Sequence, residues 1–167
     1  RGIDSGDIIA QKKTKIQDSD NITDLKKRIN NLAVELIAEN IIPVLNKTGK
    51  RIKQQIEGTY GCQRIPDDGK IDWSRSSRYI FNLIRASEPS YPAFTFLNSK
   101  KLFILEAELM EKKTYYGTFG QVGMTFKDGS VIVITGDGNL KIKKVKLDNE
   151  TSVNAKDHLN SSKLRLI

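Results

Sequence analysis

The stretch SVIVITGDGNLKIKKVKL, residues 130–147, decides the fold class of the second half of the chain. It contains two short runs rich in Val, Ile and Leu, which are typical of β-strands. Between them, Gly136-Asp137-Gly138-Asn139 supplies the glycine and asparagine that a tight turn with positive φ requires. The stretch therefore predicts two short strands joined by a tight turn.

The second of these runs, Leu140–Leu147, is rich in lysine. Its alternation slips at Lys143-Lys144, and one β-bulge there would keep Leu140, Ile142, Val145 and Leu147 facing inward. The run would then expose four lysines to water: Lys141, Lys143, Lys144 and Lys146. Such a strand can follow a phosphate backbone, which makes these lysines candidate nucleic-acid-binding residues. Alternatively, it is a solvated edge strand on which lysine blocks strand addition.

Three more β-rich runs precede this stretch at even intervals: Ala93–Leu97, Lys101–Leu109 and Gly120–Phe126. Turn residues separate the runs at Asn98-Ser99 and Asp128-Gly129. Short strands with tight turns, five in all, predict a small β-barrel. After them, a short helix capped by Thr151 or Ser152 is expected to run to about Leu159.

Helical spacing marks the first half of the chain. The Thr23 hydroxyl can accept from the free amides of a first helical turn, and apolar residues recur at helical spacing after it. These residues are Leu25, Ile29, Leu32, Ala33, Leu36 and Ile37. The pattern predicts a helix that ends near Pro43. Before it, Asp7–Ile16 starts apolar and turns polar, which predicts a strand that leaves a core for the surface.

The region Gly58–Gly69 is rich in residues that interrupt regular structure, so we place the domain junction there. Its charged part could hold a phosphate or pair internally. That part consists of Arg64, Pro66, Asp67 and Asp68. A second helix, capped by Ser74 or Ser76, is expected after the junction. Its apolar stripe would be Tyr79, Ile80, Leu83 and Ile84.

The composition excludes several kinds of site. The chain has 28 Lys and Arg against 20 Asp and Glu, a net charge of +8 that permits a polyanionic partner without requiring one. A single cysteine, Cys62, and a single histidine, His158, exclude an intrachain disulfide, a thiolate zinc site and a histidine-rich metal site. No apolar run approaches the roughly 20 residues of a membrane span, so we expect a soluble, cytoplasmic protein. Because the chain starts at Arg1, we expect it to be part of a longer protein.

Several motifs resemble those of the formyltransferases that use 10-formyltetrahydrofolate. The opening Gly2-Ile3-Asp4-Ser5-Gly6-Asp7-Ile8-Ile9 resembles the (L/I)-D-(T/S)-G-D-(I/M) string of that family. Further matches follow in the family's order: Ile71-Asp72-Trp73, Ile84-Arg85-Ala86, Tyr91-Pro92-Ala93-Phe94 and Thr135-Gly136-Asp137-Gly138. Leu164–Ile167 is similar to the family's usual C-terminal end. The resemblance covers essentially the whole chain.

The resemblance implies an α/β fragment, the end of a Rossmann-like formyltransferase domain, followed by a small OB-like open β-barrel. Residues 1–62 would be the C-terminal part of the catalytic domain, residues 63–73 a linker, and residues 74–167 the barrel domain. The missing N-terminal half of the catalytic domain would then be a required partner.

In that family an Asn, a His and an Asp surround the transferred formyl group, and the last of these matches Asp4. The resemblance thus implies that the Asp4 carboxylate helps to set the protonation of the histidine while a primary amine attacks the formyl carbon. The implied cofactor is 10-formyltetrahydrofolate. The family's Asn-x-His would lie upstream of Arg1, and His158 cannot replace it, so we expect this chain alone to be inactive.

The acceptor amine stays open, because one branch of the family formylates initiator methionyl-tRNA and another formylates nucleotide-linked amino sugars. Residues 63–73 resemble the R-x-P-x-D junction of the sugar branch, which favours an amino sugar and makes Arg64, Pro66, Asp67 and Asp68 candidate substrate-binding residues. Against this, residues 59–167 carry 17 basic and 12 acidic side chains, which a tRNA partner would explain. A lesser alternative is a non-catalytic nucleic-acid-binding module, although the lysine-rich run contains no aromatic residue that could stack on bases.

Overall fold

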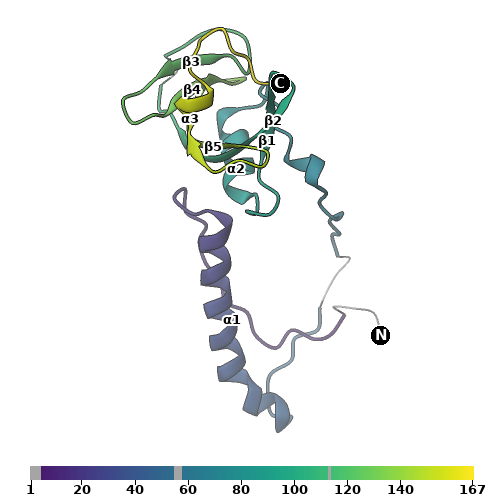
Figure 1. The fold of residues 1–167 in the computed structure, drawn as a ribbon. Coiled ribbons are helices and arrows are strands. Elements are labelled where there is room, and N and C mark those ends of the chain that lie inside the picture. The colour runs from purple at the N-terminus through teal and green to yellow at the C-terminus, as the bar shows by residue number, and fades with distance from the viewer. Residues whose placement is uncertain (1–4, 55–57, 113) are drawn as a thin grey trace. The chain divides into compact units, whose positions relative to one another are not determined.

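The computed structural model of the chain describes residues 5–54, 58–112 and 114–167 (Figure 1). The chain divides into two compact units, residues 1–63 and residues 64–167. One long helix dominates the first unit, and an antiparallel sheet with short helices forms the second. In the described part of the chain, no helix combines the length and the hydropathy of a membrane span.

The long helix, α1 (Ile22–Leu45), begins at a reciprocal cap. The Asn21 side chain accepts a hydrogen bond from the Asp24 amide (3.0 Å), and the Asp24 carboxylate accepts one from the Asn21 amide (3.4 Å). The predicted helix is confirmed, but the prediction that Thr23 caps it is wrong. Three residues after Thr23 stands Lys26, which has no acceptor, so Thr23 cannot form the reciprocal pair that Asn21 forms.

The predicted strand Asp7–Ile16 is not formed among the described residues. Its main chain pairs only at Ile8, which bridges Ile52 through hydrogen bonds of 2.8 and 3.0 Å. A strand needs a neighbour along its length, and the described residues of the first unit supply this one bridge. The segment instead contacts α1 through Lys12, whose ammonium lies 2.9 Å from the Glu35 carboxylate and 2.7 Å from that of Glu39.

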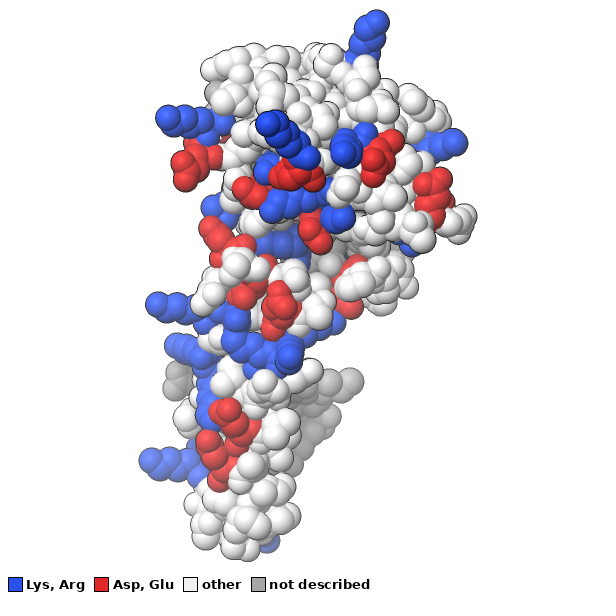
Figure 2. Space-filling model, turned by 60° about the vertical axis from the view of Figure 1, so that its left-hand side comes forward, with Lys and Arg blue, Asp and Glu red and all other residues white. Residues whose placement is uncertain are grey.

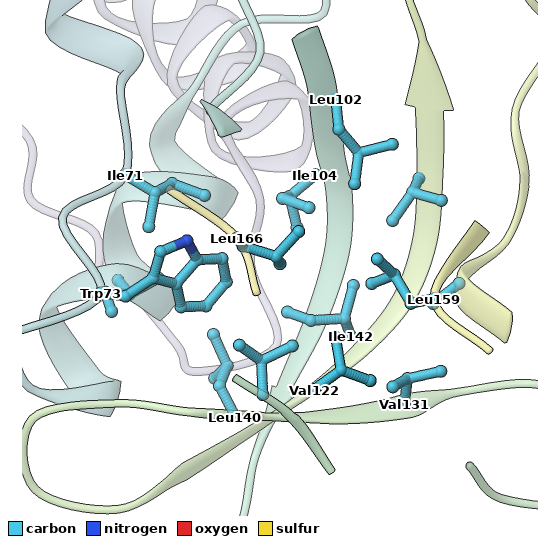
Figure 3. Packing of buried hydrophobic residues seen from close by; sticks show 14 of the residues in the cluster. Ile71, Trp73, Leu102, Ile104, Val122, Val131, Leu140, Ile142, Leu159 and Leu166 are labelled. Carbon is cyan, nitrogen blue, oxygen red and sulfur yellow. The ribbon is translucent and has the colours of Figure 1, made fainter. Parts of the chain in front are cut away.

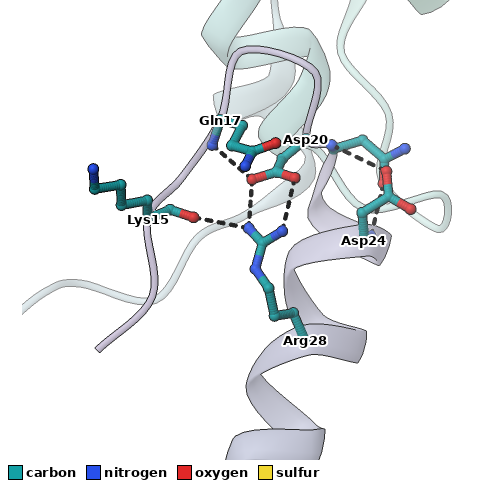
Figure 4. Close-up of polar contacts among 6 residues, drawn as sticks. Lys15, Gln17, Asp20, Asp24 and Arg28 are labelled. Carbon is teal, nitrogen blue, oxygen red and sulfur yellow. Dashed lines mark hydrogen bonds and ion pairs between the residues drawn. The ribbon is translucent and has the colours of Figure 1, made fainter. Parts of the chain in front are cut away.

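A second polar cluster holds the turn before α1 to the helix (Figure 4). The Arg28 guanidinium donates to both carboxylate oxygens of the buried Asp20 and to the Lys15 carbonyl (2.9 Å). The Gln17 amide donates to the same Asp20 carboxylate (2.7 Å). Burying a carboxylate without hydrogen-bond partners costs free energy, so these partners favour the turn in which Asp20 lies against α1.

The second unit is built on an open antiparallel sheet of six strands in the order β1-β2-β5-β4-β3, with β6 paired to β5. The strands are β1 (Phe94–Leu97), β2 (Lys100–Leu109), β3 (Val122–Thr125), β4 (Val131–Ile134), β5 (Asn139–Leu147) and β6 (Val153–Asn154). The strands predicted from the sequence, β1 to β5, are confirmed. The sequence pattern does not predict β6, which is only two residues long.

The β-bulge predicted at Lys143-Lys144 is also confirmed. Along the ladder between β2 and β5, Glu106 pairs with Lys144 and the next residue, Ala107, pairs with Ile142, so that Lys143 is left out of the register. The bulge keeps three side chains on the core face, where they are fully buried: Leu140, Ile142 and Val145.

A helix and the segment before it cover the core of this unit (Figure 3). The helix is α2 (Ser77–Ala86), capped by the Ser76 hydroxyl, which accepts from the Tyr79 amide (3.2 Å). Before it, Ile71 and Trp73 are buried among the sheet residues, and the Trp73 indole N–H donates to the Thr95 hydroxyl (3.0 Å). These two residues lie in the stretch 63–73 that was expected to be a linker, so the end of this stretch is folded with the second unit.

The last helix, α3 (Ala155–His158), is shorter than predicted. The predicted caps, Thr151 and Ser152, are wrong, because the next two residues pair with β5 as β6. The helix therefore starts only after Asn154.

The C-terminal segment Leu164–Ile167 forms hydrogen bonds with residues at both outer edges of the sheet. Ile167 exchanges main-chain hydrogen bonds with Phe96 of β1 (2.9 and 3.1 Å). The Val122 amide of β3 donates to the Leu164 carbonyl (3.0 Å), and the Leu166 amide donates to the Gly120 carbonyl (2.8 Å). Because β1 and β3 are the outer strands of the order, this segment spans the opening of a sheet that does not close on itself.

Candidate functional site

Asp4, the predicted catalytic residue, lies outside the described residues, and its role stays a prediction. The neighbouring Ser5-Gly6-Asp7 are exposed. The Gln54 side chain donates to the Gly6 carbonyl (2.6 Å), two residues from the Ile8–Ile52 bridge. The start of the described chain is therefore held against residues 52–54.

Residues of the charged loop predicted to bind substrate form hydrogen bonds with neighbouring parts of the second unit. Pro66, Asp67 and Asp68 lie in the short helix η1 (Pro66–Gly69). The Asp68 carboxylate accepts from the Ile65 amide (2.8 Å), and the Arg64 guanidinium donates to the Ser87 hydroxyl (3.1 Å) after α2. Asp67 is exposed, and its carbonyl accepts from the Lys70 amide (3.0 Å). These contacts brace the start of the second unit, and the substrate-binding role stays a prediction.

The lysines of β5 are half-buried and largely engaged. The Lys141 ammonium lies 3.0 Å from the Asp128 carboxylate, the Lys143 ammonium lies 2.6 Å from that of Glu108, and Lys144 donates to the Asn154 side chain (3.0 Å). The Glu108 contact raises the pKa of Lys143 above its ordinary value. Lys146 lies opposite Phe103 in the register of β2. The nucleic-acid-binding role of these four lysines stays a prediction.

A further group of lysines lies among aromatic rings on β1 and β2. The Lys101 ammonium is 3.7 Å from the ring centre of Phe94 and 5.4 Å from that of Phe103. The Lys70 ammonium is 5.4 Å from the ring centre of Phe96. The Phe94 ring contacts both other rings edge to face, at centroid distances of 5.8 and 6.4 Å. We refer to these residues and Lys146 as the phenylalanine–lysine patch: Phe94, Phe96, Phe103, Lys70, Lys101 and Lys146.

The strand register explains why the strand residues of the patch lie on one face of the sheet. Phe94 pairs with Phe103, Phe96 with Lys101, and Phe103 with Lys146, and residues directly opposite each other point to the same side of a sheet. The alternate residues of the same strands, Leu102 and Ile104 among them, are fully buried on the other side. The patch cannot be recognised in any single run of the sequence, because the aromatic residues and Lys146 lie on different strands. The pattern Phe94-x-Phe96 followed by Lys101-x-Phe103 was the available signal.

A second set of cation–aromatic contacts runs along α2. The Arg75 guanidinium lies 5.2 Å from the Tyr79 ring centre, and those of Arg78 and Arg85 lie 5.8 and 5.3 Å from that of Phe81. Elsewhere, basic side chains alternate with acidic ones over the face of the molecule that Figure 2 shows. Both groups of contacts, on β1 and β2 and near α2, therefore place basic side chains beside aromatic rings.

Metal ligands do not gather in the described part of the chain, where no three His, Cys, Asp or Glu side chains meet. His158 lies in α3, with its Nε2 atom 3.4 Å from the Glu150 carboxylate. Its side chain is 21% exposed and faces this carboxylate.

Residues 64–163, more than half of the chain, match the family described as Formyl transferase, C-terminal domain. The chain belongs to the formyltransferase family. The resemblance found in the motifs is thus confirmed. Among curated formyltransferases, the methionyl-tRNA formyltransferase of Fusobacterium nucleatum is 32% identical over 98% of this chain and 53% of that protein. The chain therefore spans about half the length of the curated relatives it matches.

Two solved structures share this fold. The N-formyltransferase from Helicobacter canadensis, in complex with folinic acid and dTDP-3-aminofucose, is 26% identical with a TM-score of 0.63, over 84% of this chain and 51% of that one. HypX from Aquifex aeolicus, in complex with tetrahydrofolic acid, is 18% identical with a TM-score of 0.69, over 92% of this chain and 27% of that one. The likeness to HypX shows the fold alone. The second unit thus has the fold of a formyltransferase C-terminal domain.

Proposed function

We propose that this chain is the C-terminal half of an enzyme that transfers a formyl group from 10-formyltetrahydrofolate to a primary amine. The family match supports the reaction class. The folinic acid in the Helicobacter canadensis enzyme, a relative at 26% identity, supports the folate cofactor.

The described residues alone do not fit this cofactor and its chemistry. The reaction needs a histidine beside the formyl group, and His158, the single histidine of the chain, lies in α3 of the second unit against Glu150. We assign the cofactor site and the catalytic Asn and His to the upstream half. The contribution of this chain would be Asp4: a carboxylate that accepts from the imidazole N–H orients the ring and stabilises its protonated form.

We further propose initiator methionyl-tRNA as the acceptor, and the observation that carries this is the phenylalanine–lysine patch. Each lysine that neutralises a phosphate adds salt-dependent affinity, and rings on a strand surface can stack on unpaired bases. Phe96 and Phe103 are half-buried, so part of each ring faces outward beside Lys70 and Lys101. The 32% identity to a methionyl-tRNA formyltransferase supports the same acceptor.

A nucleotide-linked amino sugar is the second candidate acceptor. The likeness to the Helicobacter canadensis enzyme, whose structure contains dTDP-3-aminofucose, favours it, and so does the junction motif at residues 63–73. The junction also has a structural role, because the Arg64 guanidinium donates to the Ser87 hydroxyl and the Asp68 carboxylate accepts from the Ile65 amide.

The proposed architecture places the end of the catalytic domain in residues 1–62, a linker in residues 63–73 and an OB-like open barrel in residues 74–167. The division of the chain after Gln63 supports the first boundary. The hydrogen bonds of Leu164–Ile167 to both β1 and Val122 support an open barrel, because they link the two outer strands of the sheet.

The deciding experiment gives the complete enzyme 10-formyltetrahydrofolate and offers methionyl-tRNA and amino-sugar nucleotides side by side. We expect formylation of methionyl-tRNA. The double variant Lys70→Ala/Lys101→Ala should raise the KM for tRNA about tenfold and reduce the slope of log affinity against log salt by about two. The matched control is Lys127→Ala/Lys156→Ala, two exposed lysines outside the patch, which should change neither value.

Formylation of the amino sugar alone would overturn the acceptor assignment. Binding of tRNA by the complete enzyme without formylation of any amine would favour the non-catalytic binding module instead. Equal effects of the two double variants would exclude the phenylalanine–lysine patch as the tRNA contact.

A further inference from the structure

Phe119 is the one exposed phenylalanine of the chain. All six phenylalanines lie in the part of the chain that the structure describes, and Phe119 is 47% exposed whereas the other five are buried or half-buried. Single exposed apolar side chains are common on protein surfaces. This one differs from them because its backbone is fixed and because it lines a groove.

The backbone at Phe119 is held in a tight turn. The Gln121 amide donates to the Thr118 carbonyl (3.0 Å). Phe119 and Gly120 are therefore the central residues of a β-turn, and the φ of +76° at Gly120 is that of a type II turn. The Gln121 side chain fixes the turn further, because its oxygen accepts from the Thr118 amide (3.1 Å) and its nitrogen donates to the Ser162 carbonyl (3.3 Å). The Phe119 ring is thus presented in advance, and a ligand that contacts it need not order this backbone.

Beside the turn is a groove of about 390 Å³, which we call the Phe119 groove. Its floor is apolar and buried, since Ile71, Trp73 and Leu166 are each at most 4% exposed (Figure 3). Phe119 and Lys70 also line it. The volume, the apolar floor and the small number of polar groups are typical of a pocket for a small organic group.

The two ends of the groove differ in charge. The described lining residues include one cation, Lys70, and one anion, Asp72. Both are exposed and alternate with the buried floor residues, so their side chains lie on the outer side of the segment. The Ser74 hydroxyl and amide donate to the Asp72 carboxylate, which lowers the pKa of that carboxyl below its ordinary value. A phosphate is therefore attracted to the Lys70 end and repelled from the Asp72 end.

The groove adjoins the phenylalanine–lysine patch. Lys70 belongs to both, and its ammonium lies 5.4 Å from the Phe96 ring centre. Ile167 is a second link, since it lines the groove and exchanges main-chain hydrogen bonds with Phe96 (2.9 and 3.1 Å). A polyanionic chain that follows the lysines of the patch would therefore reach the groove at Lys70.

We propose that the Phe119 groove holds one unpaired nucleotide of the tRNA, with its base against the Phe119 ring and the apolar floor and its phosphate at Lys70. The proposal rests on the proposed function. The charges favour this occupant, because a nucleotide joins a flat ring system to one anionic group, and the groove joins an aromatic ring to one cation. Bases in a duplex are stacked on their neighbours, so the groove would accept unpaired RNA only. A free nucleotide is the competing occupant.

The test measures binding of a short single-stranded oligouridylate to residues 1–167 by fluorescence anisotropy over a range of salt concentrations. Phe119→Leu should weaken binding about tenfold at every salt concentration, because it removes a base–aromatic stack and no charge. Lys70→Ala should instead reduce the slope of log affinity against log salt by about 0.7. The matched control is Tyr79→Leu, which should change neither value. Tyr79 is 51% exposed and lies beside Arg75, outside the groove.

Two further measurements keep the test independent of the folding of the variants. The same strand annealed to oligoadenylate should bind equally to the wild type and to Phe119→Leu, because its bases are paired. With 4-thiouridine in the single strand, irradiation of the wild-type chain should attach the RNA to the peptides that contain Lys70 or Phe119, as read by mass spectrometry.

Equal affinity of the wild type and Phe119→Leu for the single strand would overturn the proposal, and so would crosslinks confined to other peptides. Equally tight binding of uridine monophosphate would identify a free nucleotide as the occupant and overturn it as well. If Phe119→Leu weakens RNA binding but the complete enzyme formylates only an amino sugar, an RNA-binding groove remains and the proposed function is overturned. If the complete enzyme formylates methionyl-tRNA but Phe119→Leu binds RNA normally, the proposed function remains and the groove is excluded.

Discussion

Gly120 occupies a position that requires glycine. Its φ is +76°, and a Cβ there would lie 2.2 Å from the Leu166 carbonyl oxygen, which is too close for two non-bonded atoms. Gly120 also helps to hold the C-terminal segment, since its carbonyl accepts a hydrogen bond from the Leu166 amide (2.8 Å). The positive φ and the close backbone oppose any side chain together, and neither can relax without moving the C-terminal segment.

We therefore expect Gly120→Ala to destabilise the second unit by about 2 kcal/mol or more, with a Tm lower by roughly 8 °C or more. Thermal unfolding followed by circular dichroism measures both. Gly61→Ala is the control, because a Cβ at Gly61 meets nothing within 4 Å. If the two variants melt at the same temperature, the C-terminal segment does not hold the sheet in the way described.

Asp128 makes the stability of the second unit depend on pH. The Ser130 hydroxyl and amide and the Lys141 ammonium donate to its carboxylate, and they lower its pKa far below the ordinary value. A carboxylate whose pKa is lower in the folded than in the unfolded state stabilises the fold above its unfolded pKa, about 3.9. That contribution is lost as the pH falls below this value towards the folded-state pKa.

The free energy of unfolding should therefore fall more steeply between about pH 5 and about pH 2 in the wild type than in Asp128→Asn. Urea titrations across this range measure the difference. Asp148→Asn, an exposed carboxylate just after β5, should keep the wild-type slope. Parallel curves for the wild type and Asp128→Asn would show that the Ser130 and Lys141 contacts contribute nothing to the pH dependence.

At the scale of elements, local patterns predicted the second unit well. Alternation and turn residues located β1 to β5 within about two residues, and the slip at Lys143-Lys144 located the bulge, because strand period and turn chemistry are local properties. The cap of α1 was missed by two positions, since Asn21 depends on Asp24 as well as on its own side chain. The strand Asp7–Ile16 was not found, because a strand forms only against a neighbour that its own sequence cannot show.

The candidate sites show the same limit. The sequence predicts that Lys141, Lys143 and Lys144 face water. In the structure they contact Asp128, Glu108 and Asn154, which lie elsewhere in the chain and which the pattern of β5 cannot show. The phenylalanine–lysine patch depends on the register of three strands, which no single run contains. Sequence motifs were sufficient to recognise the family, whereas the pairing of strands determines which basic residues lie beside aromatic rings.

At the scale of the whole molecule, the two units differ in what holds them together. All buried hydrophobic residues of the described chain lie in residues 71–166, and most of them form one cluster that joins α2, the sheet, α3 and the C-terminal segment. The first unit has polar contacts, at Asp20–Arg28 and at Lys12, and an unpacked helix. Ion pairs near the surface contribute little to stability, whereas a buried apolar cluster supports cooperative folding.

We therefore expect residues 64–167 to fold alone and to unfold in one cooperative transition, with a Tm within about 3 °C of that of residues 1–167. The reason is that removal of residues 1–63 takes away no member of the buried cluster. Thermal unfolding of the two chains, followed by tryptophan fluorescence from the buried Trp73, makes the comparison, because this chain has no other tryptophan. Residues 1–63 alone should show no cooperative transition by circular dichroism. A broad, non-cooperative transition of residues 64–167 would mean that the first unit contributes to the core of the second, and a sharp one in residues 1–63 would mean that α1 needs no partner.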